Sequence, residues 1–300
     1  MAKSKSFFGL RRGSTKTLTF QVNNGKQITK DRVYEVKNPR TQEQMVQRMV
    51  MATASAAYAG MKQIVDHSFE GITYGQMNMS EFIRVNAKKL RENLGAANPV
   101  MCFNKYQDRS LVPGAYIMSS GTASNFPVDP LVYSSEEVSA TGLQVHLETA
   151  VGSAATTNKI AAKYGIGLND LMTVCGIQFN SSKESWDFVF VRFTLLDLSD
   201  TALSAANIAE HIKIESNVAI TTTPNNNQID VKTAGTDTDQ AGVAFCVIHS
   251  VKTANGWTRN NTVLDISGIE AQFMNPTEED AIATYPIGGS YVLNGGEVNG

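Results

Sequence analysis

The first regular pattern along the chain is an alternation of polar and apolar residues from Thr17 to Val22. A period of two residues is typical of a strand with one buried face. The turn signal Asn24-Gly25 follows, and the chain then returns through Ile28. We therefore predict a β-hairpin over about residues 15–36. Its polar face is expected to carry four basic side chains, namely Lys16, Lys26, Lys30 and Arg32.

A helical period replaces this alternation after Asn38-Pro39. Thr41, followed three residues later by Gln44, matches a capping box and predicts a helix start. One stripe of this helix holds small and apolar residues: Met45, Met49, Ala52, Ala56 and Ala59. The stripe predicts a buried face, which packs either on the chain's own sheet or between subunits.

A second helix is predicted to start near Asn78, with Glu81 completing another capping box and Gly95 as its C-terminal cap. Phe82 and Leu90 lie on its apolar side. Its outward face carries Arg84, Lys88, Lys89 and Arg91. This face is either simply solvated or an extension of the basic surface of the hairpin.

Beyond residue 96 the composition changes to short strands and turns. One or two helical turns are expected from Asn158 to Tyr164, ended by Gly165. Strands are predicted at 171–179, 186–195, 242–251 and 257–266. The fold class is therefore α+β and mainly β. We expect a basic arm and hairpin over residues 1–40, a helical segment over 41–96, and a β-rich body with a Gly-rich tail over 97–300, built as a β-sandwich or jelly roll.

Charge is segregated along the chain. Residues 1–50 hold eleven basic and three acidic residues, a net charge of +8, whereas residues 51–300 carry −10. Such segregation points to a polyanionic partner, and we expect nucleic acid. The alternatives are a solvated terminus or an arm docked on the acidic body of a neighbour. The expected nucleic-acid contacts are Arg11, Arg12, Lys16, Lys26, Lys30, Arg32 and Arg40.

The sequence contains no recognisable catalytic, metal or cofactor motif. It has no phosphate loop, dinucleotide fingerprint or nucleophile elbow. Its four histidines are dispersed, and Cys246 and His249 would point to opposite faces of a strand, which argues against zinc. We expect no enzyme activity, cofactor, metal or small-molecule substrate, although distant residues could still assemble a site.

The tryptophans indicate where the chain makes packing or binding contacts, and the cysteines indicate the redox compartment of the protein. Trp186 and Trp257 each open the returning strand of a hairpin and either anchor a core or interface or stack nucleic-acid bases. With Met45, Met49, Ala52 and Ala56, they are the expected contacts of a homo-oligomer. The three cysteines are far apart and odd in number, which indicates buried thiols in a reducing compartment. No signal peptide or membrane span is recognised, so we expect synthesis in the cytosol.

The first ninety residues resemble uncharacterised proteins encoded by Bacteroidetes and by phages of the gut. In that family a basic strand pair precedes an Asn-Pro-x-Thr-x-x-Gln-x-x-x-Arg helix start. Here these positions are Asn38, Pro39, Thr41, Gln44 and Arg48. The segments LNDLMTVCGIQF and AFCVIHSVKTANGWTRN are similar to β segments of the same proteins. The resemblance covers about half of the chain and implies a viral or mobile-element origin.

These observations together predict a virion structural protein, in a capsid or associated with one, of a bacterial virus. It would be assembled in the host bacterial cytoplasm and would self-associate through strand edges and the first helix. Its arm would contact genome phosphates without sequence preference, or thread into a neighbouring subunit. The alternative is a soluble protein that binds single-stranded nucleic acid.

Overall fold

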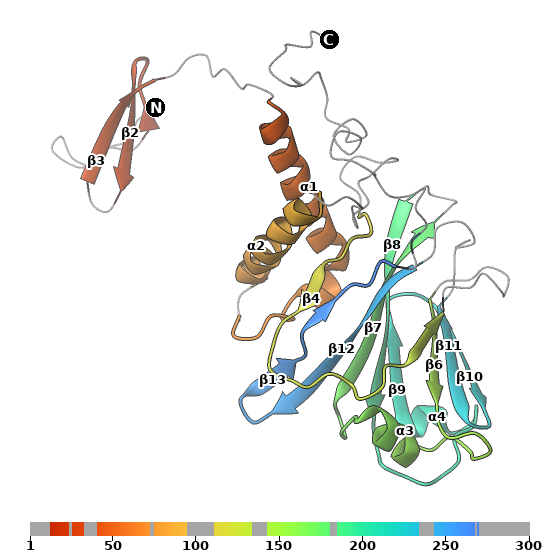
Figure 1. Ribbon diagram of the computed structural model, residues 1–300. Helices are drawn as coiled ribbons and strands as arrows, with labels where there is room; N and C mark the ends of the chain where they lie inside the picture. The colour runs from red at the N-terminus through yellow and green to blue at the C-terminus, as the bar shows by residue number, and fades with distance from the viewer. Residues whose placement is uncertain are drawn as a thin grey trace. The chain divides into compact units, whose positions relative to one another are not determined.

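The computed structural model describes residues 13–23, 26–32, 41–72, 75–94, 111–133, 143–180, 185–233, 243–267 and 269. Its helices are α1 (Gln42–Val65), α2 (Gly75–Leu94), α3 (Thr157–Tyr164) and α4 (Ile208–His211). Its strands are β1 (Gly13–Ser14), β2 (Leu18–Asn23), β3 (Lys26–Asp31), β4 (Ile117–Ser119), β5 (Leu131–Tyr133), β6 (Gln144–Glu148), β7 (Leu171–Asn180), β8 (Ser185–Leu195), β9 (Ile212–Ser216), β10 (Ile220–Asn225), β11 (Gln228–Thr233), β12 (Val243–Thr253), β13 (Gly256–Arg259) and β14 (Thr262–Val263). Figure 1 shows this arrangement, which confirms the mainly β, α+β fold class. None of the described helices is long and apolar enough to cross a membrane.

The described residues fall into two compact units. Strands β1–β3 form the first, and all elements from α1 to β14 belong to the second. In the first unit, β2 pairs with β1 on one side and with β3 on the other, always antiparallel. The predicted hairpin is thereby confirmed, with the short strand β1 added to it. A sheet this small is marginally stable by itself, because so little apolar surface is buried.

Two antiparallel sheets build the β body of the second unit. Their strand orders are β13-β12-β7-β8-β9 and β10-β11-β6-β5. One core fills the space between them, with Val174, Val191, Phe193 and Val247 from the first sheet and Val145, Leu147, Ile229 and Val231 from the second. The body is therefore a β-sandwich, one of the two architectures that the sequence left open.

Helix α3 closes this sandwich core with Ile160 and Tyr164. The hydroxyl oxygen of Thr156 accepts a hydrogen bond from the backbone N–H of Lys159 at 3.3 Å, which caps the helix start. Gly165 ends the helix with a φ of 65°, as predicted from the sequence. The Tyr164 hydroxyl accepts a hydrogen bond from the Glu148 N–H at 2.8 Å and so ties the helix to β6.

Helices α1 and α2 pack around an aromatic cluster centred on Phe82. The ring of Phe82 lies 5.8 Å from that of Tyr58, 6.4 Å from Phe69 and 6.1 Å from Tyr116. All four side chains are buried, and they come from α1, the segment after α1, α2 and the segment before β4. Aromatic pairs at these centroid distances add to the stability gained from burial. The cluster thus joins the two helices to the segment that carries β4.

Asparagine side chains extend the sheets where backbone pairing stops. Asn86 on α2 accepts a hydrogen bond from the Ile117 N–H at 2.7 Å and donates to the Ile117 carbonyl at 3.1 Å. Asn260 accepts in the same way from the N–H of His249 at 2.9 Å. Asn217 binds the edge of β8, accepting from the Phe190 N–H and donating to the Phe188 carbonyl. Each amide therefore takes the place of a peptide group of a neighbouring strand.

Two predicted element boundaries were wrong. The strand expected at 257–266 divides, because β13 ends at Arg259 and β14 pairs with β4 instead. The strand ends here because the side-chain oxygen of Asn260, and not a backbone carbonyl, accepts the hydrogen bond from the His249 N–H. Helix α2 starts at Gly75, so Asn78 lies inside it, and Glu81 binds Arg84 instead of capping the helix. Gly95 lies outside the described residues.

Tyr58 provides a test of the packing between α1 and the segment that follows it. Its hydroxyl donates a hydrogen bond to Asp66, and the side chain is buried. Burial, followed by the hydrogen bond to Asp66 and the charge of that carboxylate, raises the pKa of Tyr58 from 10.0 to about 12. The folded state thus holds the Tyr58 proton more tightly than the unfolded state does, and this stabilisation is complete below pH 10.

Above pH 10 the unfolded state ionises first, so the stabilisation is lost as the pH rises toward 12. We expect wild type to lose on the order of 2 kcal/mol more unfolding free energy over this window than Tyr58→Phe does. Urea titrations of both proteins at pH 9 and pH 11.5 test this. Parallel losses in the two proteins would show that Tyr58 is not responsible.

Candidate nucleic-acid interface

The hairpin of the first unit has two chemically different faces. Strand pairing places Lys30 opposite Thr19 and Lys26 opposite Asn23, so these residues share one face with Ile28. Asp31 lies on the other face, opposite Leu18. Lys26 and Lys30 are both exposed. The face that they share, here called the hairpin basic face, carries no carboxylate among the described residues of this unit.

The remaining predicted arm residues differ in their placement. Lys16 is exposed in the turn between β1 and β2. The Arg32 backbone N–H donates to the Thr17 carbonyl at 2.7 Å, and its Nη1 donates to the Thr15 carbonyl at 3.2 Å. Arg32 therefore holds this turn in place in addition to contributing positive charge. Arg11, Arg12 and Arg40 lie outside the described residues.

Helix α2 contributes less positive charge than its sequence suggests. Arg84 donates from Nε to Glu81 Oε2 at 2.8 Å, and this hydrogen bond lowers the pKa of Glu81. Lys88 Nζ lies 3.7 Å from Glu92 Oε1. Two of the four outward cations are thus balanced by carboxylates of their own helix, while Arg91 is exposed. The outward face of this helix is therefore only weakly basic.

A second basic surface was missed by the sequence analysis. In the five-stranded sheet, Trp257 pairs with Lys252 and Arg259 pairs with Ser250, while Arg192 and Thr194 pair with Glu215 and Lys213 of β9. The register places all of these side chains on the face opposite the sandwich core. We call Arg192, Lys213, Lys252, Trp257 and Arg259 the basic sheet face. Strand β13 contributes two of them and β12, β8 and β9 contribute one each, so the cluster exists only through pairing between distant segments.

Positive charge on the basic sheet face is incompletely balanced. Glu215 is the carboxylate that the register places on this face, 2.6 Å from Lys213 Nζ and 3.6 Å from Arg192 Nη1. The carboxylate of Glu70, at the rim, acts on Arg259 as well. The hydrogen bond from Lys213 is the main cause of the lowered pKa of Glu215. Arg259 is half-buried, and burial first and the positive charge of Arg192 second lower its pKa. Two guanidinium groups within electrostatic reach of each other favour an anion between them.

The rim of this face is built by a close approach of two chain segments. Glu70 accepts hydrogen bonds from the Thr122 N–H at 2.7 Å and from the Thr122 hydroxyl. A Cβ atom on Gly121 would lie 2.4 Å from the Arg259 carbonyl oxygen and 2.6 Å from Glu70 Oε2. Only glycine fits at this position without displacing β13. Glu70 is thereby committed to holding the loop beside Arg259.

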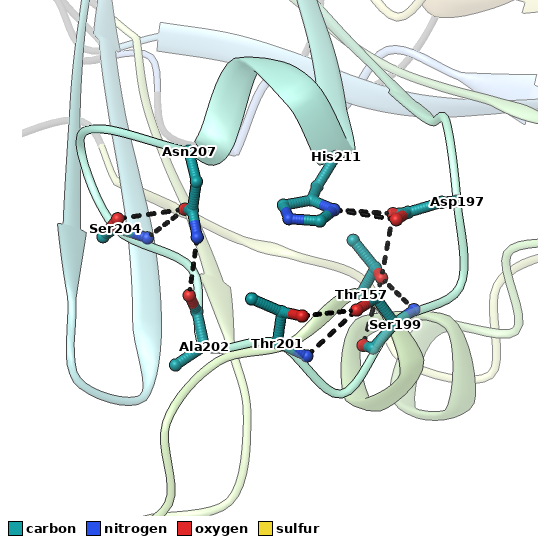
Figure 2. A network of polar contacts seen from close by, with 8 residues as sticks. All are labelled: Thr157, Asp197, Ser199, Thr201, Ala202, Ser204, Asn207 and His211. Atoms are coloured by element: carbon teal, nitrogen blue, oxygen red, sulfur yellow. Dashed lines mark hydrogen bonds and ion pairs between the residues drawn. The ribbon is translucent and has the colours of Figure 1, made fainter.

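The polar contacts shown in Figure 2 hold a loop in place and do not form a catalytic triad. His211 Nδ1 lies 2.8 Å from Asp197 Oδ2. The hydroxyl oxygen of Thr157 accepts a hydrogen bond from the Ser199 N–H at 2.8 Å. The Ser199 hydroxyl, however, donates to Thr201 at 2.8 Å and not to the histidine. A nucleophile in a triad must bond to the base, so these contacts attach the loop between β8 and α4 to the start of α3.

The other two histidines of the sandwich also lie beside carboxylates. His146 Nδ1 is 2.6 Å from Asp230 Oδ1, and His249 Nε2 is 3.7 Å from Asp170 Oδ2. Asp230 is further bound by the side chains of Asn225 and Gln228. No group of three or more metal-ligand side chains occurs within the described part of the chain.

The expected interface residues have different exposures within this single chain. Met45 and Met49 are fully buried, and Trp186 is 6% exposed. These three side chains therefore serve the core of their own subunit, the alternative that the sequence left open for the helix. Ala52, Ala56 and Trp257 are half-buried. Of the six expected interface residues, only these three have enough exposed surface for a second subunit or a nucleic acid to contact.

Comparison of the chain with known protein families, curated proteins and solved structures finds no match. Flexible ammonium and planar guanidinium groups on flat β surfaces bind phosphate oxygens by charge and hydrogen bonding. Both basic surfaces have this composition.

Proposed function

We propose that this protein is a virion structural protein of a bacterial virus, which self-associates and holds nucleic acid through phosphate contacts of its N-terminal arm. The observation that carries the nucleic-acid role is the hairpin basic face, where Lys26 and Lys30 project together and Asp31 is kept on the opposite side. The resemblance of the first ninety residues to uncharacterised proteins encoded by Bacteroidetes and by gut phages supports a viral or mobile-element origin. Because such contacts recognise phosphate and not bases, binding is independent of sequence and weakens steeply with salt.

The double variant Lys26→Gln/Lys30→Gln tests the hairpin contact. Removing two phosphate contacts is expected to weaken binding to a fluorescein-labelled single-stranded oligonucleotide about tenfold at low salt. It should also flatten the slope of log K against log salt concentration by about 1.4. Fluorescence anisotropy over a potassium chloride series provides both values.

Gln27→Glu/Thr29→Glu is the matched control. It changes the net charge by the same amount, but on the opposite face of the same strand. The control is expected to keep the wild-type salt slope, because it removes no phosphate contact. Equal slopes in all three proteins would exclude the hairpin basic face as the binding surface. Light-scattering mass in the same salt series separately tests self-association.

The second candidate function is a soluble protein that binds single-stranded nucleic acid. It is favoured by Trp257, which is half-buried on the basic sheet face between Lys252 and Arg259. Bases stack on such aromatic side chains without sequence preference. If this surface binds, an oligonucleotide quenches tryptophan fluorescence in wild type and not in Trp257→Phe, where buried Trp186 remains as the only tryptophan.

A further inference from the structure

Two cysteines face each other in the centre of the five-stranded sheet. Cys246 of β12 lies directly opposite Cys175 of β7 in the strand register. Cys175 is fully buried and Cys246 is 6% exposed. Their thiols are in hydrogen-bond contact, and neither forms a disulfide. The third cysteine, Cys102, lies outside the described residues.

The backbone hydrogen-bond pattern fixes the distance between these two residues. Phe245 exchanges both of its backbone hydrogen bonds with Asp265, at 2.9 and 2.8 Å, and therefore faces away from β7. Successive residues of a strand alternate in direction, so Cys246 directs its N–H and C=O groups toward Cys175. Hydrogen-bonded antiparallel pairs have Cα atoms about 5.5 Å apart. Disulfides span Cα distances of about 4.4–6.8 Å, so the crosslink fits the native register.

We propose that Cys175 and Cys246 form a reversible disulfide that links β7 to β12 when the protein meets a small disulfide oxidant such as glutathione disulfide. One cysteine thiolate attacks the oxidant, forms a mixed disulfide and releases one glutathione thiolate. The second cysteine thiolate then attacks the protein sulfur of this mixed disulfide and expels the second glutathione. Two protein thiols are oxidised, and their two protons leave with two glutathione thiols.

The surroundings of the pair make this exchange slow. Burial raises the pKa of Cys175 well above its ordinary value, and the hydrogen bond and charge of Cys246 raise it further, while Arg192 acts in the opposite direction. The reactive species is the thiolate, so the closed sheet protects both sulfurs. Reaction therefore requires local separation of β12 from β7.

The same geometry makes the crosslink easy to reduce. Directly opposite Cβ atoms in a sheet lie about 4.5–5.5 Å apart, whereas a disulfide draws them to about 3.5–4.5 Å. The strands must move closer together, and a strained disulfide is reduced more readily than a relaxed one. The pair is thus a thiol pair in a reducing cytosol and a bond between the two central strands in oxidising surroundings. This inference concerns the body of the chain and is independent of nucleic-acid binding.

The experiment incubates the full-length reduced protein with glutathione redox buffers of increasing glutathione disulfide content. Remaining thiols are then blocked in denaturant, and the chain is analysed by intact mass and peptide mapping. We expect a species lighter by two hydrogen atoms, with the peptides containing Cys175 and Cys246 joined, and its full reversal by dithiothreitol. Cys102→Ser is expected to form the same bond, because the third thiol takes no part.

Cys246→Ala serves as the matched variant, since it replaces one partner by a small apolar residue. It should carry at most a glutathione adduct and form no internal crosslink. Full alkylation of both Cys175 and Cys246 at every buffer composition would overturn the proposal, as would crosslinks that join only separate chains. Because the wild-type map contains the decisive result, the proposal is tested even if the variant fails to fold.

Discussion

Phe193→Ala is expected to lower the free energy of unfolding of the sandwich by about 3–5 kcal/mol. Phe193 lies on β8, is 1% exposed and projects into the core between the two sheets. Removal of its ring leaves a cavity among side chains from several strands, which cannot all move inward to fill it. A urea titration followed by tryptophan fluorescence measures the loss, since Trp186 lies on the same strand.

Thr194→Ala is the matched control for this prediction. The next residue of β8 points to the opposite face and is half-buried, so its replacement should cost less than about 1 kcal/mol. Similar losses at the two positions would mean that the register of β8 differs from the one described. That result would also remove the basis for placing Arg192 on the basic sheet face.

Asn86→Ala is expected to destabilise the second unit by about 2–4 kcal/mol. Asn86 is 1% exposed, and its amide satisfies both the N–H and the carbonyl of Ile117. Alanine leaves two part-buried backbone groups of Ile117 without their side-chain partners, each at a cost in the lower part of the range of about 1–3 kcal/mol. Chemical denaturation measures the total effect.

Asn158→Ala makes the corresponding change at a half-buried asparagine whose side-chain hydrogen bond is exposed to solvent. Its amide donates to Asp200 Oδ1 at 2.9 Å in contact with solvent, so water replaces the lost bond and the expected change stays within about 0.5 kcal/mol. If Asn86→Ala were as mild as this control, the amide bridge between α2 and β4 would not fasten the helices.

Local sequence patterns predicted those elements whose signals lie within a few residues. Alternation and an Asn-Gly turn predicted the pairing of β2 with β3, and Gly165 marked the end of α3. The strands β7 and β8 were also predicted to within a residue at each end. In each case the structure follows the local preference because neighbouring packing does not oppose it.

Features that depend on pairing between distant segments were not predicted. The basic sheet face joins Arg192 to Arg259, which are brought to one face by three intervening strand pairings and not by any motif. Strand β13 ends where the side-chain amide of Asn260 binds the His249 N–H, and the strand propensity of the residues does not predict such a contact. The predicted stripe of the first helix is buried at Met45 and Met49 but exposed at Ala59, and periodicity alone does not say which surface covers a helix.

The order of strands in the five-stranded sheet has a consequence during synthesis of the chain. Strand β7 pairs with β8 almost at once, but its other neighbour, β12, begins about 60 residues after β7 ends. At a typical rate of about 5–20 residues per second, the inner edge of β7 stays without its partner for roughly 3–12 s on the ribosome. An open edge in the centre of a future sheet can pair with the same edge of another nascent chain. Crowded translation on one messenger therefore favours misassembly of this protein, and slower initiation should increase its soluble yield.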